Sequence, residues 1–147
     1  MDKIALIVSI ISIVISIIIS VIEAKRTFRI NKSSLESDYF KKIFMEHLIY
    51  EIPKRRKYIR FDRNGKLKDT KKLAEELNQI RQDSLYFLYN DKLFYGNLKK
   101  ATQVLEDYLV KKEDSIFLGE EQTDALNFIQ EKIKNLYEII NKRYIGK

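Results

Sequence analysis

The sequence predicts an all-α protein with one N-terminal transmembrane helix followed by a cytoplasmic bundle of about four helices. Residues 4–22 are nineteen residues of Ile, Val, Leu, Ala and Ser without a charge. As a helix they would span about 28 Å, close to the hydrocarbon thickness of a bilayer. The whole chain has only four Gly and one Pro, and after residue 34 its apolar residues recur at spacings of three and four. That spacing is typical of helices that pack against one another.

The charges that flank the apolar run predict the domain organisation and the orientation. Four basic residues follow the run, whereas Asp2 and Lys3 cancel before it. The positive-inside rule therefore places the C-terminal part in the cytoplasm and the N-terminus outside the inner membrane, in a single pass. A cleaved signal peptide fits less well, because the apolar run is long and no small-x-small site follows it. The predicted parts are an anchor over residues 1–22, a basic juxtamembrane linker over 23–34 and a helical domain over 35–147.

One face of the predicted membrane helix carries only small side chains. At 100° per residue these side chains lie within an arc of about 80° that no Ile, Leu or Val enters. Small residues let helix backbones approach, and hydroxyl groups can hydrogen-bond across the contact. The alternative is that each hydroxyl bonds back to a carbonyl of its own helix, and a serine-lined pore is a special case of association. The predicted association face comprises Ala5, Ser9, Ser12, Ser16 and Ser20.

The first helix of the cytoplasmic domain is predicted from Leu35 to Ile52, because Pro53 disfavours a helical residue before it. His47 lies on this helix and is the only histidine. Its neighbours in the sequence offer neither a second metal ligand at a usual spacing nor a nucleophile. A packed or surface histidine is therefore the favoured interpretation.

Residues 54–72 form a local basic stretch, with ten Lys and Arg against two Asp. A short hairpin is predicted near residues 58–67, with Asn64-Gly65 as its turn. The stretch could be a solvated loop, contact a protein or anionic lipid, or bind phosphates of a nucleic acid or nucleotide while its aromatic residues stack a base. The candidate partner-binding or anion-binding residues are Lys54, Arg55, Arg56, Lys57, Arg60 and Arg63.

Three further helices are predicted, over about 70–88, 91–112 and 120–144. Aromatic residues crowd the turn at Asn90-Asp91, where a packed helix corner is favoured over a ligand pocket. Residues 113–124 hold five Asp and Glu and no Lys or Arg. Because carboxylates are favoured at a helix start, a metal or catalytic role for them is the less favoured interpretation. In an up-and-down bundle, this acidic stretch should lie beside the basic stretch.

Several short runs carry a resemblance to a known group of proteins. They are YFKKIF, IPKRRKYIRF, GKL, IRQDSLYFLY and LEDYLV, between Tyr39 and Val110. In these runs the chain resembles small single-span proteins from mobile and phage-defence loci of AT-rich bacteria. The resemblance implies a membrane-anchored component of antiviral defence and assigns no site residue.

The sequence contains no phosphate-binding glycine loop, zinc-ligand spacing, nucleophile elbow or Cys–His pair. We therefore expect no enzyme, catalytic residue, metal or cofactor. The leading hypothesis is a self-associating, membrane-anchored effector or scaffold, a homo-oligomer acting through its Ser-striped helix. A second hypothesis is an adaptor that tethers a cytoplasmic protein to the bilayer. A third is a membrane-tethered binder of nucleic acid or nucleotide through residues 54–72.

Overall fold

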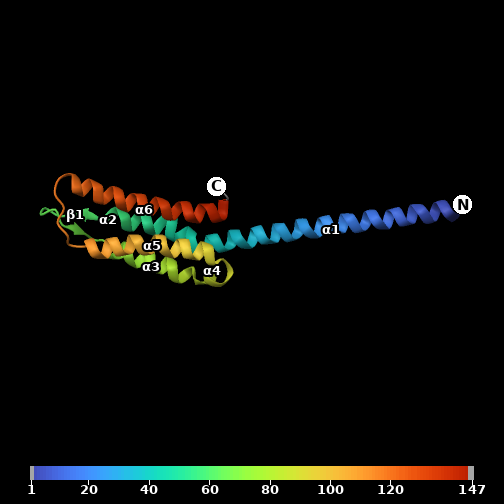
Figure 1. Cartoon of the computed structure of the whole chain (residues 1–147), viewed down its shortest axis with the longest axis horizontal. Coiled ribbons are helices and arrows are strands. Elements are labelled where there is room, and N and C mark those ends of the chain that lie inside the picture. Colours follow the sequence, from blue (N-terminus) through green and yellow to red (C-terminus); the bar gives the residue numbers. More distant parts are fainter. Residues whose placement is uncertain (1, 146–147) are drawn as a thin grey trace. The chain divides into compact units, whose positions relative to one another are not determined.

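The structure is a computed structural model that describes the backbone of residues 2–145 and the side chains of residues 12–144. The chain divides into two compact units, residues 1–38 and residues 39–147. Most described residues are helical (Figure 1), and two short π-helices, η1 and η2, interrupt the α-helices. The elements are α1 (Asp2–Phe40), η1 (Lys41–Met45), η2 (His47–Glu51), α2 (Ile52–Tyr58), β1 (Arg60–Phe61), β2 (Leu67–Lys68), α3 (Lys71–Asp83), α4 (Leu85–Asn90), α5 (Lys92–Lys112) and α6 (Glu120–Ile145).

The first unit consists of most of α1, and here the predicted fold class needs correction. Among the described residues, no helix is long and apolar enough to cross a membrane, so the predicted transmembrane helix is wrong. From residue 12 on, the apolar residues of α1 continue only as far as Ile22. Glu23 and Lys25 follow directly. The other residues of the predicted span, 4–11, lie outside the described side chains.

The second unit confirms the predicted helical bundle. In it, α3 packs against α5, α5 packs against α6, and α2 packs against α3, and these helices run side by side (Figure 1). The apolar positions that recur at three and four spacing face one shared core, because one stripe of each helix can be buried there. The largest fully buried side chains are Phe44, Ile52, Leu67, Leu73, Leu77, Ile80, Leu98, Leu105, Leu109, Ile129, Leu136 and Ile140.

The crowded aromatic residues form a packed corner, as predicted. The ring of Phe44 lies 6.1 Å from Phe87, 6.0 Å from Phe94 and 5.8 Å from Tyr144. Phe87 and Phe94 are 3% and 5% exposed. The first pair is stacked and the other two are edge-to-face, and both arrangements are favourable for aromatic pairs at these distances. The corner is therefore part of the core.

The π-helix η2 and Pro53 are related through the backbone hydrogen bonds before the proline. In a π-helix a carbonyl accepts from the N–H five residues on, and the Ile52 N–H donates to His47 in this way. The carbonyl of Leu48 would accept from residue 53, which is proline and has no N–H. The Tyr137 hydroxyl donates to this carbonyl instead, at 2.7 Å. The helix therefore continues past Pro53 as α2, whereas the sequence predicted that it ends at Ile52.

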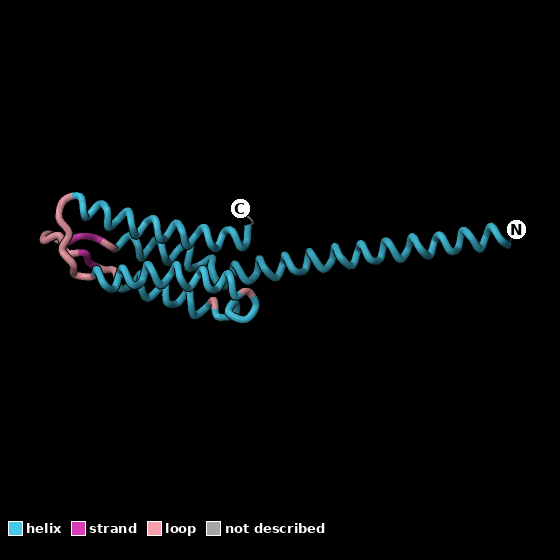
Figure 2. The backbone as a smooth tube through the Cα atoms, in the orientation of Figure 1, coloured by secondary structure: helices cyan, strands magenta, loops and turns pink. Residues whose placement is uncertain are grey.

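The predicted hairpin and the predicted contact between the charged stretches are both present. Strands β1 and β2 pair antiparallel, with Phe61 opposite Leu67. Lys66 forms a bridge with Ile116 from the loop after α5, and the Lys68 ammonium forms an ion pair with Asp114. Figure 2 shows the strands and this loop together at one end of the bundle. The basic and acidic stretches are thus neighbours, as predicted from an up-and-down bundle.

The predicted helix over about 70–88 is two helices in the structure. Thr70 occupies the N-cap position of α3, but its hydroxyl donates to the Leu109 carbonyl, 3.0 Å away, and it does not cap the helix. Ser84 breaks the helix with φ −89° and ψ 3°, and its hydroxyl donates to the Ile80 carbonyl at 2.6 Å. Asp91 then caps α5 by accepting from the Phe94 N–H at 3.1 Å.

Candidate functional site

The most unusual surface among the described residues is the apolar part of α1. Eight Ile and Val side chains between residues 12 and 22 are each 48–59% exposed. They point in every direction around the helix except toward the serine face. Scattered exposed apolar residues are ordinary, but a contiguous set of this size indicates contact with something else. We call residues 12–22 the apolar segment.

The structure places three of the five predicted association residues together. Ser12, Ser16 and Ser20 line one shallow hollow on α1 with Ile13 and other apolar neighbours. The Ser16 hydroxyl donates to the Ser12 carbonyl at 2.8 Å, which is the bond to its own helix that the alternative interpretation expects. Ala5 and Ser9 lie outside the described side chains.

The predicted basic patch is less positive than its sequence indicates. Arg55 lies against Glu51 and Glu76, Arg60 lies 3.3 Å from Asp69, and Lys54 lies 3.3 Å from Glu51. Burial lowers the pKa of the Arg56 guanidinium, since a charged group is less stable away from water. Lys57 and Arg63 are exposed. Three of the six residues, Lys54, Arg55 and Arg60, therefore pair with carboxylates, and only part of the stretch is a free cationic surface.

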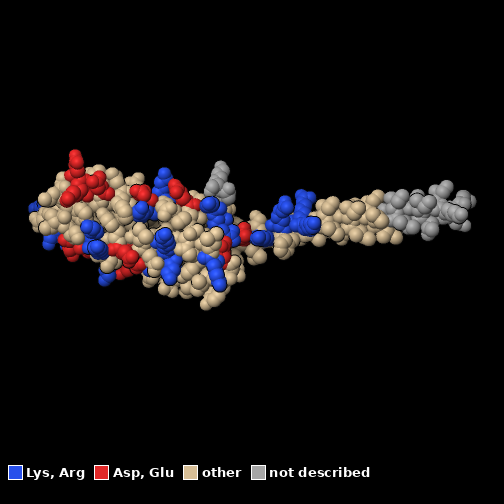
Figure 3. Space-filling view, viewed as in Figure 1, with Lys and Arg blue, Asp and Glu red and all other residues tan. Residues whose placement is uncertain are grey.

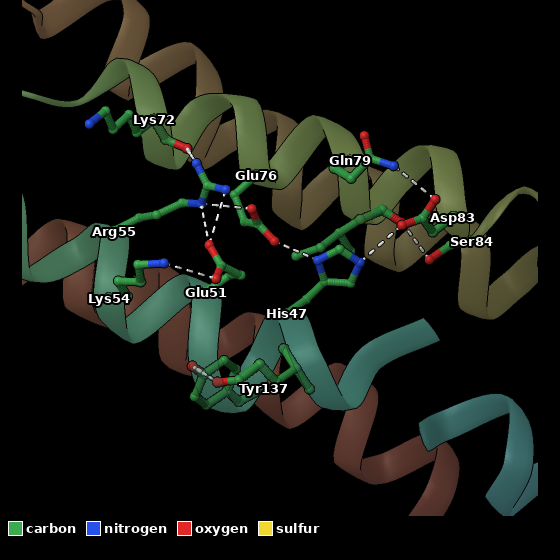
Figure 4. Close-up of polar contacts among 12 residues, drawn as sticks. His47, Glu51, Lys54, Arg55, Lys72, Glu76, Gln79, Asp83, Ser84 and Tyr137 are labelled. Carbon is green, nitrogen blue, oxygen red and sulfur yellow. Dashed lines mark hydrogen bonds and ion pairs between the residues drawn. The ribbon is translucent and has the colours of Figure 1, made fainter. Parts of the chain in front are cut away.

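A charge network around His47, with the buried Glu76 at its centre, is the functional candidate that the sequence did not reveal. His47 Nδ1 lies 2.5 Å from Glu76 Oε1, and its Nε2 lies 3.0 Å from Asp83 Oδ2. Arg55 Nε lies 2.7 Å from the other Glu76 oxygen, and another of its nitrogens lies 3.1 Å from Glu51. The Glu76 side chain is only 5% exposed. Figure 4 shows these side chains reaching between η2 and α2 on one side and α3 on the other.

This network joins two segments of the bundle and lacks the arrangement of a catalytic triad. Both carboxylates are acceptors only, so the imidazole satisfies both when each ring nitrogen carries a proton. Ser84, the neighbour of Asp83 in the sequence, is fully buried and donates its hydroxyl proton to the Ile80 carbonyl. No group of three or more His, Asp or Glu among the described residues could hold a metal ion. The chemistry that this geometry supports is a charge-assisted connection between η2, α2 and α3.

The sequence predicted a packed or surface histidine because it showed no partner near His47. Its partners lie 29 and 36 residues away on α3. One feature of the sequence could have indicated this network, although weakly. Glu76 lies between Leu73 and Leu77 among the apolar positions of α3, where a buried carboxylate needs a partner.

The chain was compared with protein-family models, with curated proteins and with solved structures, and none of the three comparisons finds a match. The function is therefore argued from the surfaces and contacts above.

Proposed function

We propose that the chain is a non-enzymatic scaffold or effector that self-associates through the apolar segment of α1, while its bundle holds a partner protein. The observation that carries this proposal is the exposure of eight Ile and Val side chains, each about half accessible, within residues 12–22. Burying one such side chain from half exposure contributes roughly 1 kcal/mol. A contact on one face of the helix buries the side chains that border that face in each copy, so only part of the eight contributes, and the entropy of association is subtracted from that contribution.

The serine face indicates which side of α1 contacts the second copy. Ser12, Ser16 and Ser20 share one hollow, so the backbone of a second helix can approach there more closely than on the Ile faces. The opposite face, which includes Val14 and Ile18, offers branched side chains that keep backbones apart. We therefore place the contact between copies at the serine face.

The proposed location is the cytoplasmic side of the inner membrane. Exposed basic residues follow the apolar segment, and they would favour a surface of anionic lipid. The resemblance of residues 39–110 to proteins of phage-defence loci supports a role in antiviral defence. Membrane flotation of the full chain tests the location: the protein should float with vesicles, and a chain that stays with the soluble fraction contradicts this part of the proposal. The basic residues are Lys25, Arg26, Arg29 and Lys32.

Two matched double variants test self-association. Ser12→Leu with Ser16→Leu fills the hollow, whereas Val14→Leu with Ile18→Leu changes the opposite face by similar chemistry. Light scattering of the full chain in mild detergent should give a monomer mass for the first variant and the wild-type oligomer mass for the second. If the serine variant keeps the wild-type mass, the serine face is not the contact between copies.

An adaptor that does not self-associate is the second candidate function. It is favoured by the Ser16 hydroxyl, which already has a partner in its own helix. It predicts a monomer mass for wild type and for both double variants. Binding of nucleic acid or nucleotide by residues 54–72 is less well supported, because Arg55, Arg60 and Lys68 each pair with a carboxylate.

A further inference from the structure

A groove runs between α5 and α6 on the bundle. It consists of two adjoining hollows of about 390 and 360 Å³ that share Asn97 and Ile139. Its apolar lining includes Leu93 and Val104, which are 77% and 41% exposed. Leu93 and Val104 are eleven residues apart on one helix, so the groove is about 16 Å long. That length matches three turns of a helix lying in it.

The groove has a basic rim whose residues come from two separate helices, so it is not visible as a basic stretch of the sequence. Asp91 pairs with Arg143 at 2.9 Å, and the rings of Tyr108 and Phe128 lie 4.3 Å apart. These contacts show that α5 and α6 are antiparallel, so residues 92–104 lie beside residues 132–144. The charged residues that line the groove are Lys100, Lys132, Lys142 and Arg143 against one carboxylate, that of Asp91. Acidic side chains gather over the start of α6, at the other end of the bundle (Figure 3).

Two lysines on this rim are available to a partner. Lys100 and Lys142 line the groove, and neither forms an ion pair with any residue in the described part of the chain. The third lysine on the rim, Lys132, lies 3.0 Å from its neighbour Glu131. An apolar floor between two free cations is complementary to an apolar stripe flanked by carboxylates.

We propose that this α5–α6 groove binds an acidic amphipathic helix of a partner protein. Leucine-like side chains of that helix would lie on Val104, Ile139 and Leu93, and its carboxylates would meet Lys100 and Lys142. A groove between two helices receives a third helix through anchors at positions i, i+3, i+4 and i+7. This inference rests on the proposed scaffold function only in that it names the kind of partner the scaffold holds.

The test uses the full chain and a designed probe. The probe is a fluorescein-labelled helical peptide with Leu at i, i+3, i+4 and i+7 and Glu on both sides of that stripe. A peptide of the same composition with scrambled order is the control. Fluorescence anisotropy should show binding of the amphipathic probe at least tenfold tighter than binding of the scrambled one.

Matched variants locate the binding. Lys100→Glu with Lys142→Glu should weaken the probe at least tenfold. Lys134→Glu should change its affinity less than twofold, because Lys134 lies outside the groove lining and is 76% exposed. Val104→Arg should weaken the probe at least tenfold and Val110→Arg less than twofold, since Val110 is 64% exposed on the same helix but outside the groove.

Three results would overturn the proposal. The first is that wild-type protein at about 0.5 mM does not bind the probe. The second is that the scrambled peptide binds as tightly as the probe. The third is that the groove variants and their controls lose the same amount of probe affinity. Circular dichroism confirms that each variant is folded before its affinity is compared. The oligomer mass is measured on the same samples, so loss of self-association and loss of probe binding are separate outcomes.

Discussion

Replacing Glu76 by Gln removes the buried charge that joins His47 to Arg55. Gln preserves the size of the side chain, but its neutral amide cannot replace a carboxylate that accepts from the His47 ring 2.5 Å away and pairs with a guanidinium 2.7 Å away. Removal of one partner from a buried ion pair costs about 3–5 kcal/mol. The lower end applies, because Arg55 is 27% exposed and keeps Glu51, and His47 keeps Asp83. We expect a loss of about 3 kcal/mol in the free energy of unfolding.

Urea denaturation of the full chain, followed by near-ultraviolet circular dichroism, measures this loss. With a slope of about 2 kcal/mol per molar urea, the midpoint should fall by about 1.5 M. Glu75→Gln is the matched control: Glu75 is the exposed neighbour of Glu76 on α3 and makes no ion pair with a described residue. Its midpoint should stay within about 0.3 M of wild type. If both variants shift the midpoint equally, the network does not hold η2 and α2 to α3.

Three further changes test separate features. Tyr137→Phe removes the hydroxyl that satisfies the Leu48 carbonyl, and urea denaturation should show a loss of about 1–2 kcal/mol. Gly65→Ala should destabilise the bundle by about 2 kcal/mol or more, because φ is +76° and the new Cβ would lie 2.5 Å from a backbone oxygen. Gly96→Ala meets open space in a helix and should stabilise by about 0.5–1 kcal/mol, so equal effects at the two glycines would contradict this account. Backbone N–H donors, chiefly that of Lys66, lower the pKa of Asp62. Its carboxylate should therefore stabilise the hairpin fully above pH about 4 and progressively less as the pH falls toward the lowered pKa, and a carboxyl NMR titration that finds the ordinary pKa would refute this.

The two longest helices of the bundle could be predicted because local pattern and tertiary packing agree. The helices predicted over 91–112 and 120–144 correspond to α5 and α6 within a residue or so. The break at Ser84 was not predicted, because the apolar spacing runs through it and only the tertiary packing bends the chain there. The π-helices η1 and η2 were not predicted either, because nothing in the local sequence indicates them. The Leu48 carbonyl in η2 accepts its hydrogen bond from Tyr137, which is 89 residues away.

The membrane prediction shows a different limit. It was based on the apolar composition of residues 4–22. Such a composition shows only that burying these side chains away from water is favourable. It does not distinguish lipid from other copies of the same helix. Among the described residues no helix is able to cross a membrane, yet the Ile and Val side chains of residues 12–22 are exposed, and this exposure is the basis of the proposed self-association.

Charge was the least predictable property of the surface. Arg55, Arg60 and Lys68 belong to one basic run in the sequence, but each has a carboxylate partner in the structure. Conversely, Lys100 and Lys142 are 42 residues apart and meet on one groove only because α5 and α6 pair antiparallel. Local counts of charge cannot supply either result, because both depend on which helices are neighbours.

Single-cysteine cross-linking tests self-association through the serine face most directly. The chain has no cysteine, so one introduced residue reports on one position. Ser16→Cys should form a disulfide-linked dimer on mild oxidation, because cross-linking requires Cβ atoms about 4 Å apart and small side chains allow that approach. Ile18→Cys, on the opposite face of α1, should stay monomeric under the same conditions. Cross-linking of Ile18→Cys as strongly as Ser16→Cys, or of neither, would contradict the account.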